Sequence, residues 1–198
     1  LGRDGSQTMT THIHVRVPAT TANLGPGFDS LGLALTLHNH VRVRVEGLRR
    51  SRRAVSDVRV EVRGLGAGRL PSGPENLVWR AAARVLAECG LSARSVALRC
   101  LNRIPLQSGL GSSAAACVAG LVAADALAGG RLGRERLLEI AAEMEGHADN
   151  AAAALWGGLT VCYDAAGTPR CVPVRLRARL AVVAAVPDME LATSKARG

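Results

Sequence analysis

Aromatic side chains are nearly missing from this chain of 198 residues, which has one phenylalanine, one tyrosine and two tryptophans. Proteins that bind single-stranded nucleic acid commonly stack the bases on aromatic rings, so the composition leaves little for that mode of binding. Lysine is nearly absent too, because Lys195 is the only one in the chain. A Walker-type phosphate loop needs a lysine directly after its last glycine, and this class of nucleotide site is therefore excluded.

Long hydrophobic runs are also absent. The longest, 114–124, is too short to cross a bilayer, and residues 1–30 contain no hydrophobic segment of a secretory signal. The five cysteines are odd in number and show no C-x-x-C spacing, which predicts reduced thiols rather than disulfides or a zinc site. We therefore expect a cytoplasmic protein without a membrane partner.

The rest of the composition is typical of one globular domain. Hydrophobic residues make up 48% of the chain and charged residues 21%, and the length suffices for a buried core. The net charge is +9, and eight arginines fall between Arg42 and Arg63. Because that stretch contains no aromatic residue, we interpret it as a solvated strand pair and its loop, and we expect no nucleic-acid partner.

Hydrophobic periodicity predicts the elements. Hydrophobic residues at every second position predict strands, and hydrophobic residues three or four positions apart predict helices with one apolar face. The helix predicted after residue 112 is apolar almost all round. Strands followed by a helix, a strand, two helices and further strands are typical of an α+β layer rather than of a regular βαβ series. The expected strands are 13–17, 31–37, 41–45, 58–62, 95–101, 159–163 and 180–186, and the first of them stops at Pro18. The expected helices are 75–89, the segment that follows the loop at 105–115 and runs to about 128, and 134–143.

A glycine- and serine-rich loop precedes the most apolar helix. Gly109 and Gly111 can adopt backbone angles closed to other residues, and Ser112 and Ser113 are expected at the N-cap of the helix. The first turn would then present N–H groups and the positive end of the helix dipole to an anion. A dinucleotide fingerprint matches only formally, since Pro105 interrupts the preceding strand and the expected acidic residue is missing. We predict a phosphate-binding loop.

Two further loops carry polar residues. Taken alone, each residue can be explained as a turn residue, a surface charge or a histidine that is hydrogen-bonded within the protein. With the serine loop, they provide what ATP-dependent phosphorylation of an alcohol needs: N–H groups for phosphates, a hydroxyl and a carboxylate for Mg²⁺, and an acid or base near the acceptor. These residues are Asn23 and Asp29 in the first loop and Glu143, Glu145, His147, Asp149 and Asn150 in the second.

Four motifs resemble those of the homoserine kinases, a family of the GHMP small-molecule kinases. They occur in the family's order from about residue 18 to the end of the chain. The resemblance implies an α+β fold of the ribosomal protein S5 domain 2-like type, a GHMP kinase N-terminal domain with a mixed sheet and helices packed on one side. The motifs are P-A-T-T-A-N-L-G-P-G-F-D-S-L-G at 18–32, P-L-Q-S-G-L-G-S-S-A-A at 105–115, E-G-H-A-D-N at 145–150 and T-S-K-A-R at 193–197.

The resemblance also implies the reaction and the roles of residues. ATP with Mg²⁺ would phosphorylate the side-chain hydroxyl of L-homoserine to O-phospho-L-homoserine, in threonine biosynthesis. It leaves open whether Asp149 removes the hydroxyl proton or positions the substrate, and it makes Glu143 a weaker metal ligand than Glu145. Gln107 occupies a position where many members have glycine. The implied roles are catalysis for Asp149 and Glu145; Mg²⁺ for Ser112 or Ser113 with Glu145; adenine for Asn76; homoserine for Asn23, Asp29, His147 and Arg197; and the ATP phosphates for Pro105, Leu106, Gln107, Ser108, Gly109, Leu110, Gly111, Ser112, Ser113, Ala114 and Ala115.

The implied domain plan places an N-terminal ATP-binding domain at 9–186, starting at Met9 as the natural first residue. Residues 1–8 would lie upstream or be disordered, and 187–198 would begin the connection to a C-terminal domain that completes the site. On this interpretation the chain alone folds marginally and has little turnover, and a homodimer is left open. The rivals are another GHMP kinase of the mevalonate type, a basic RNA-binding module of the same fold, and a metal-binding protein that uses His12, His14, His38 and His40.

Overall fold

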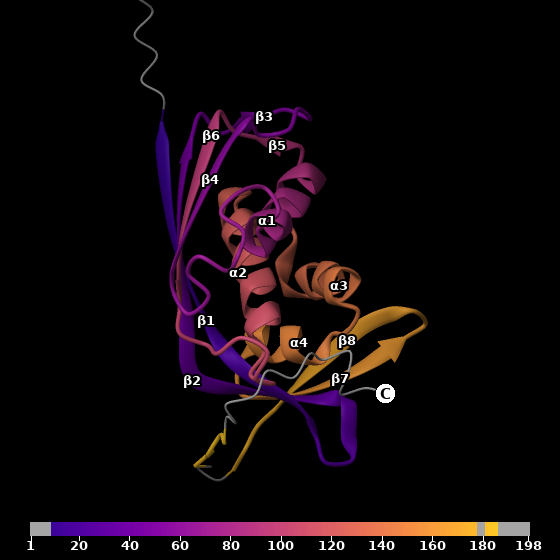
Figure 1. The fold of residues 1–198 in the computed structure, drawn as a ribbon. Coiled ribbons are helices and arrows are strands. Elements are labelled where there is room, and N and C mark those ends of the chain that lie inside the picture. Colours follow the sequence, from indigo (N-terminus) through magenta and orange to yellow (C-terminus); the bar gives the residue numbers. More distant parts are fainter. Residues whose placement is uncertain (1–8, 178–180, 186–198) are drawn as a thin grey trace, which may run out of the picture.

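A computed structural model describes residues 9–177 and 181–185. A six-stranded mixed sheet is covered on one face by helices, so the predicted α+β class and the placement of the helices on one side are confirmed (Figure 1). The sheet has the order β4-β6-β2-β7-β8, with β1 paired to β2, and β3 pairs with β5 separately. The strands are β1 Thr10–Leu24, β2 Gly27–Glu46, β3 Arg49–Arg50, β4 Asp57–Gly64, β5 Leu91–Ser92, β6 Ser95–Asn102, β7 Leu159–Ala165 and β8 Thr168–Val174.

Strand β2 joins the two halves of the sheet. It is antiparallel to β1 along most of its length, to β6 from His40 to Glu46, and to β7 from Leu31 to Leu33. Strand β4 is parallel to β6 and is connected to it through α1, which makes the sheet mixed. The 31–33 segment of β2 therefore lies beside β7, at the end of the sheet where the site described below is found.

The helices cover the inner face of the sheet, and α2 is the central one (Figure 1). Helix α2 is buried almost all round, as its uniformly apolar sequence predicts. Among the described helices, none has the length and hydropathy to cross a membrane. The helices are α1 Leu77–Glu88, α2 Ser112–Leu127, α3 Gly133–Glu145 and α4 Asp149–Trp156, and the core residues of the sheet include Val15, Val17, Val41, Val43, Val45, Val60, Val96 and Leu98.

The segment 18–32 is not the open turn region that its glycines and prolines suggested. Strand β1 continues through Pro18 to Leu24, and a tight connection leads directly into β2. Proline is tolerated because β1 pairs with β2 alone and the register shifts between Pro18 and Thr20. Asn23 therefore lies in β1 and Asp29 in β2, and the two strands expected at 31–37 and 41–45 are one.

Two elements near the end of the described chain were missed. Helix α4 was not predicted, although alanines at 151–154 favour a helix. Strand β8 was not predicted because it contains two prolines, which an edge strand accommodates. The strand expected at 180–186 is wrong in its described part, since residues 181–185 have no regular structure.

Candidate active site

Helix α2 begins at Ser112, and its N-cap is Gly111 rather than a serine. Gly111 has a φ of 65°, and a Cβ there would collide with Thr20 Oγ1, so only glycine fits this position. Ser112 and Ser113 are the first two helical residues, which corrects the predicted N-cap. The N–H groups of the first turn have no acceptor within the helix, and no acidic residue lies in that turn. The start of α2 is therefore suited to an anion.

Thr20 connects this loop to two other elements. Its backbone N–H donates to the Leu110 carbonyl oxygen at 3.1 Å, and its Oγ1 donates to Asn150 Oδ1 at 2.8 Å. The side chain of Thr20 is completely buried. One residue of β1 thus joins the phosphate loop to the start of α4. Thr20 belongs to the A-T-T-A-N motif but was not among the predicted site residues.

The variant Thr20→Val should lower the free energy of unfolding by about 1 kcal/mol, because the shape is kept but the hydrogen bond to Asn150 is lost. The backbone hydrogen bond to Leu110 is kept, so the loss is confined to the contact with α4. The urea unfolding midpoint and the melting temperature both measure it. Thr21→Val, one position along the same strand, is the control and should change neither. Equal effects of the two variants would contradict the role given to Thr20.

The hairpin of β1 and β2 carries Asn23 and Asp29. The backbone N–H of Asp29 donates to Asn23 Oδ1 at 2.9 Å, and both residues have positive φ, 58° and 54°. Non-glycine residues in this backbone region often mark ligand sites, because the strain persists only where the surroundings enforce it. Beyond them, Gly32 lies so close to the backbone oxygen of Asp149 that a Cβ would overlap it. The hairpin is thus attached to the phosphate loop through Thr20 and to α4 through Gly32.

Ser113 and Glu145 meet across the loop. Ser113 Oγ donates to Glu145 Oε1 at 3.0 Å, although the residues are 32 positions apart. Glu143 instead pairs with Arg84 at 3.3 Å and Arg136 at 3.6 Å. Glu145 is therefore the carboxylate that faces the loop. A hydroxyl and a carboxylate beside a helix terminus that is suited to an anion also suit Mg²⁺, which takes oxygen ligands.

His147 and Asp149 form a second pair at the start of α4. His147 Nδ1 lies 3.0 Å from Asp149 Oδ1, and the same oxygen accepts from the backbone N–H of Asn150 at 2.7 Å. Asp149 is fully buried, whereas 20% of the His147 side chain is exposed. Asp149 can therefore fix the orientation of the His147 ring.

A cavity of about 290 Å³ lies between the start of α1 and the phosphate loop, and Asn76, Ser112 and Ser113 line it. Asn76 is the N-cap of α1: its Oδ1 accepts from the Val78 N–H at 3.0 Å, and its Nδ2 donates to the Pro71 carbonyl oxygen at 2.7 Å. Asn76 therefore shapes the wall of the cavity. A larger hollow of about 840 Å³ lies between the 51–58 loop and α1 and contains none of the candidate residues.

The loop residue Gln107 has a φ of 53°, in the region that glycine adopts without cost. Many homoserine kinases have glycine at the position that Gln107 occupies here. The positive φ explains this, because glycine adopts it without steric cost. Arg197, the fourth predicted homoserine contact, lies outside the described residues, as does the whole T-S-K-A-R motif.

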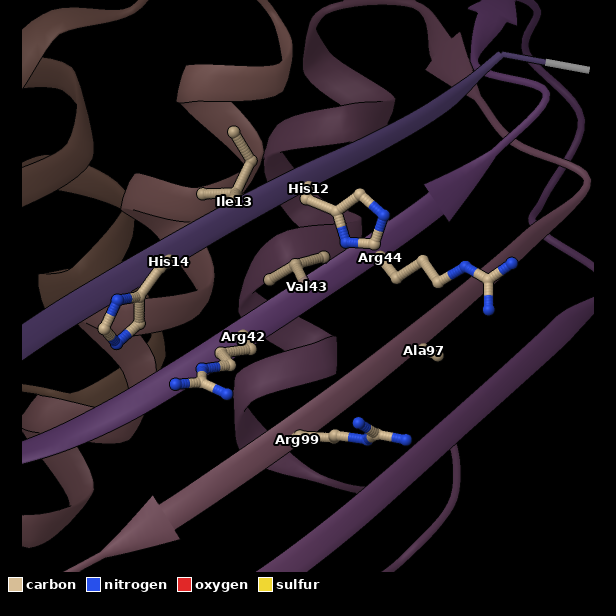
Figure 2. A pocket seen from close by; sticks show the side chains of 8 residues that line it. All are labelled: His12, Ile13, His14, Arg42, Val43, Arg44, Ala97 and Arg99. Carbon is tan, nitrogen blue, oxygen red and sulfur yellow. The ribbon is translucent and has the colours of Figure 1, made fainter.

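The outer face of the sheet is basic and forms a hollow of about 440 Å³ around Ala97 (Figure 2). Its arginines include Arg44, which pairs with Glu46 at 2.7 Å, and Arg99, which pairs with Glu61 at 3.3 Å. These ion pairs agree with a solvated strand surface.

The histidines of the metal-binding rival lie on or beside this face, and the structure pairs two of them. His14 Nε2 is 3.2 Å from His40 Nδ1, and burial, followed by the nearby Arg103, lowers the pKa of His40. Among residues 9–177 and 181–185, no group of three or more histidine, cysteine or acidic side chains could hold a metal ion.

Comparisons with known proteins agree with the family resemblance of the sequence. The family model described as GHMP kinases N terminal domain matches residues 76–158, which include the phosphate loop, Glu145 and His147. A homoserine kinase of Mycolicibacterium vanbaalenii is 45% identical over 91% of this chain and 58% of its own length. One from Synechococcus sp. RCC307 is 42% identical over 98% of this chain and 60% of its own length. The chain thus spans about three fifths of these relatives.

Solved structures give the same result. The crystal structure of homoserine kinase from Cytophaga hutchinsonii superimposes with a TM-score of 0.74, at 33% identity, over 96% of this chain and 60% of that protein. Mevalonate kinase of Methanococcus jannaschii, at 13% identity over 83% of this chain and 56% of that protein, has a TM-score of 0.58 and shares the fold alone. In sequence and in fold, this chain is therefore similar to the homoserine kinases, and its residues 76–158 match the GHMP kinases N terminal domain.

Proposed function

We propose that this chain is the nucleotide-binding part of an ATP-dependent L-homoserine kinase. The observation that carries the proposal is the convergence of three motifs: Thr20 contacts both Leu110 and Asn150, and Ser113 contacts Glu145. We also infer that the protein works in the cytoplasm, because all five cysteines are free thiols.

In this proposal the ATP phosphates bind the N–H groups at the start of α2, and the adenine occupies the cavity beside Asn76. Ser113 and Glu145, with Ser112 as the alternative hydroxyl, hold Mg²⁺, which would neutralise charge on the phosphates. The 290 Å³ cavity adjoins these serines, so base and phosphates would be bound by neighbouring surfaces.

Homoserine binds between the β1–β2 hairpin and the start of α4. The carboxylate of Asp29 suits its ammonium group, and Asn23 and His147 supply hydrogen bonds. Arg197 suits the α-carboxylate, through two parallel N–H···O bonds. The hydroxyl oxygen of homoserine attacks the γ-phosphorus, the bond from that phosphorus to the bridging oxygen of ADP breaks, and the hydroxyl proton is released to solvent. A loose transition state needs little base strength, so alignment by His147 and Asp149 can suffice.

The test is ADP release by the full-length gene product with Mg²⁺·ATP and, in parallel, homoserine, mevalonate, galactose or no acceptor. We expect turnover with homoserine only. Asn23→Ala and His147→Ala should each lower kcat/KM for homoserine by at least about 10-fold through lost hydrogen bonds to substrate. His12→Ala, on the outer face of the sheet, is the control and should leave the rate unchanged.

Two outcomes would overturn the proposal. Turnover with mevalonate or galactose instead of homoserine would keep the nucleotide site and replace the substrate. No turnover with any acceptor, together with RNA binding that weakens steeply with salt and does not respond to Mg²⁺·ATP, would favour the RNA-binding rival.

The expectation that a further domain completes the site has its own test. Turnover by residues 1–198 alone, equal to that of the full-length product, would refute it.

A further inference from the structure

The hairpin of β7 and β8 places two cysteines directly opposite each other. Cys162 on β7 is the register partner of Cys171 on β8 (Figure 1 shows the hairpin). The hairpin closes through a two-residue turn, in which Ala166 and Gly167 both have positive φ, 54° and 83°. Such a turn is flanked by a hydrogen-bonded pair, here Ala165 and Thr168.

Antiparallel strands alternate hydrogen-bonded and non-hydrogen-bonded pairs. Counting from the turn, Asp164 with Pro169 is a non-hydrogen-bonded pair, and so is Cys162 with Cys171. The two prolines of β8 fit this alternation. Pro169 and Pro173 both fall in non-hydrogen-bonded pairs, where the residue on β8 donates no N–H to β7.

Non-hydrogen-bonded pairs bring their Cα atoms to about 4.5 Å, which lies within the range spanned by disulfides. The thiols already interact, because each influences the pKa of the other. Burial raises the pKa of Cys162 to about 12 and raises that of Cys171 as well. Cys171 lies on the edge strand and is half-buried, whereas Cys162 is 4% exposed. A reagent in solution therefore meets Cys171 first.

We infer that Cys162 and Cys171 form a reversible thiol–disulfide site, oxidised by a small disulfide such as glutathione disulfide. The Cys171 sulfur, as thiolate, attacks one sulfur of glutathione disulfide; the S–S bond breaks, and one glutathione leaves and takes up the proton. The Cys162 sulfur then attacks the Cys171 sulfur, and the second glutathione leaves with the second proton. Two protein thiols are oxidised by two electrons, and one glutathione disulfide is reduced to two glutathiones.

The position of this pair suggests what the bond would hold. Cys162 is three residues from Leu159, which pairs with Leu33 of β2, and the charge of Asp149 contributes to the raised pKa of its thiol. Thr160, between them, donates from Oγ1 to the Gly32 carbonyl oxygen at 3.1 Å. The disulfide would fix β8 to the strand that supports the β1–β2 hairpin and the start of α4. The other cysteines have no such partner opposite them on a neighbouring strand among the described pairs.

Trypsin provides a direct readout, because it cuts after Arg170, between the two cysteines. The reduced protein yields separate peptides 137–170 and 171–175, each with one cysteine. After incubation of the full-length gene product with excess glutathione disulfide at mildly alkaline pH, and blocking of remaining thiols, we expect these two peptides to be linked. Dithiothreitol should separate them, and the oxidised protein should melt about 3 °C higher because the bond constrains the unfolded chain.

Cys89→Ser is the matched control, since Cys89 is also half-buried, and it should leave the linked peptide unchanged. Cys171→Ser should abolish it. Recovery of peptide 171–175 only as a free thiol, or only with glutathione attached, would overturn the inference. This result is obtained with the wild-type protein and needs no variant. The test does not depend on the proposed kinase activity, so either proposal can fail without the other.

Discussion

Glu145→Gln should lower kcat/KM of the full-length gene product by on the order of 100-fold in the homoserine assay. The amide keeps the size of the side chain and can still accept from Ser113 Oγ, but it removes the negative charge that we assign to Mg²⁺. The Mg²⁺ concentration for half-maximal rate should therefore rise. Steady-state kinetics over a Mg²⁺ titration measures both effects.

Glu143→Gln is the matched control, two residues earlier on the same helix. Its carboxylate is exposed and pairs with Arg84 and Arg136, so the variant should lose well under about 1 kcal/mol of stability and keep the Mg²⁺ dependence of the rate. If Glu143→Gln and Glu145→Gln changed the Mg²⁺ dependence equally, the assignment of the metal to Glu145 would be wrong.

Gly120→Ala should destabilise the protein by about 2 kcal/mol, although alanine is the better helix former. Gly120 lies in the middle of α2, where a Cβ would overlap the carbonyl oxygen of Val78 and come within 3.0 Å of the Ala82 nitrogen. These are backbone atoms of α1 that cannot rotate away, so the two helices must separate. The urea unfolding midpoint of the full-length gene product measures the loss.

Gly73→Ala is the control for this substitution. A Cβ at Gly73 would meet nothing within 4 Å, and the residue has no positive φ, so the change should stay within about 0.5 kcal/mol of zero. A Gly120→Ala variant as stable as the Gly73→Ala variant would show that α1 and α2 have room to move apart.

The parts of the site that are local in sequence could be predicted. The loop at 105–115 was correctly expected to precede an apolar helix, and its phosphate-binding role stays a prediction. Asn76 was correctly expected at a helix start. Asn23 and Asp29 were interpreted as loop residues, which is wrong because they lie in β1 and β2, and their ligand role stays a prediction. The predicted N-cap serine was wrong, because Gly111 holds that position and the Thr20 side chain, 91 positions earlier, leaves no room there for a Cβ.

The sequence by itself determined the α+β class, the apolar core helix and the glycine- and serine-rich loop before it, because periodicity and local backbone preference act within one element. The tertiary structure decided which of the distant polar residues meet: Ser113 with Glu145 rather than Glu143, Thr20 with Asn150, and Cys162 with Cys171. These contacts depend on strand register and helix packing. A shift of one residue reverses which side chains face each other, and no local pattern encodes that choice.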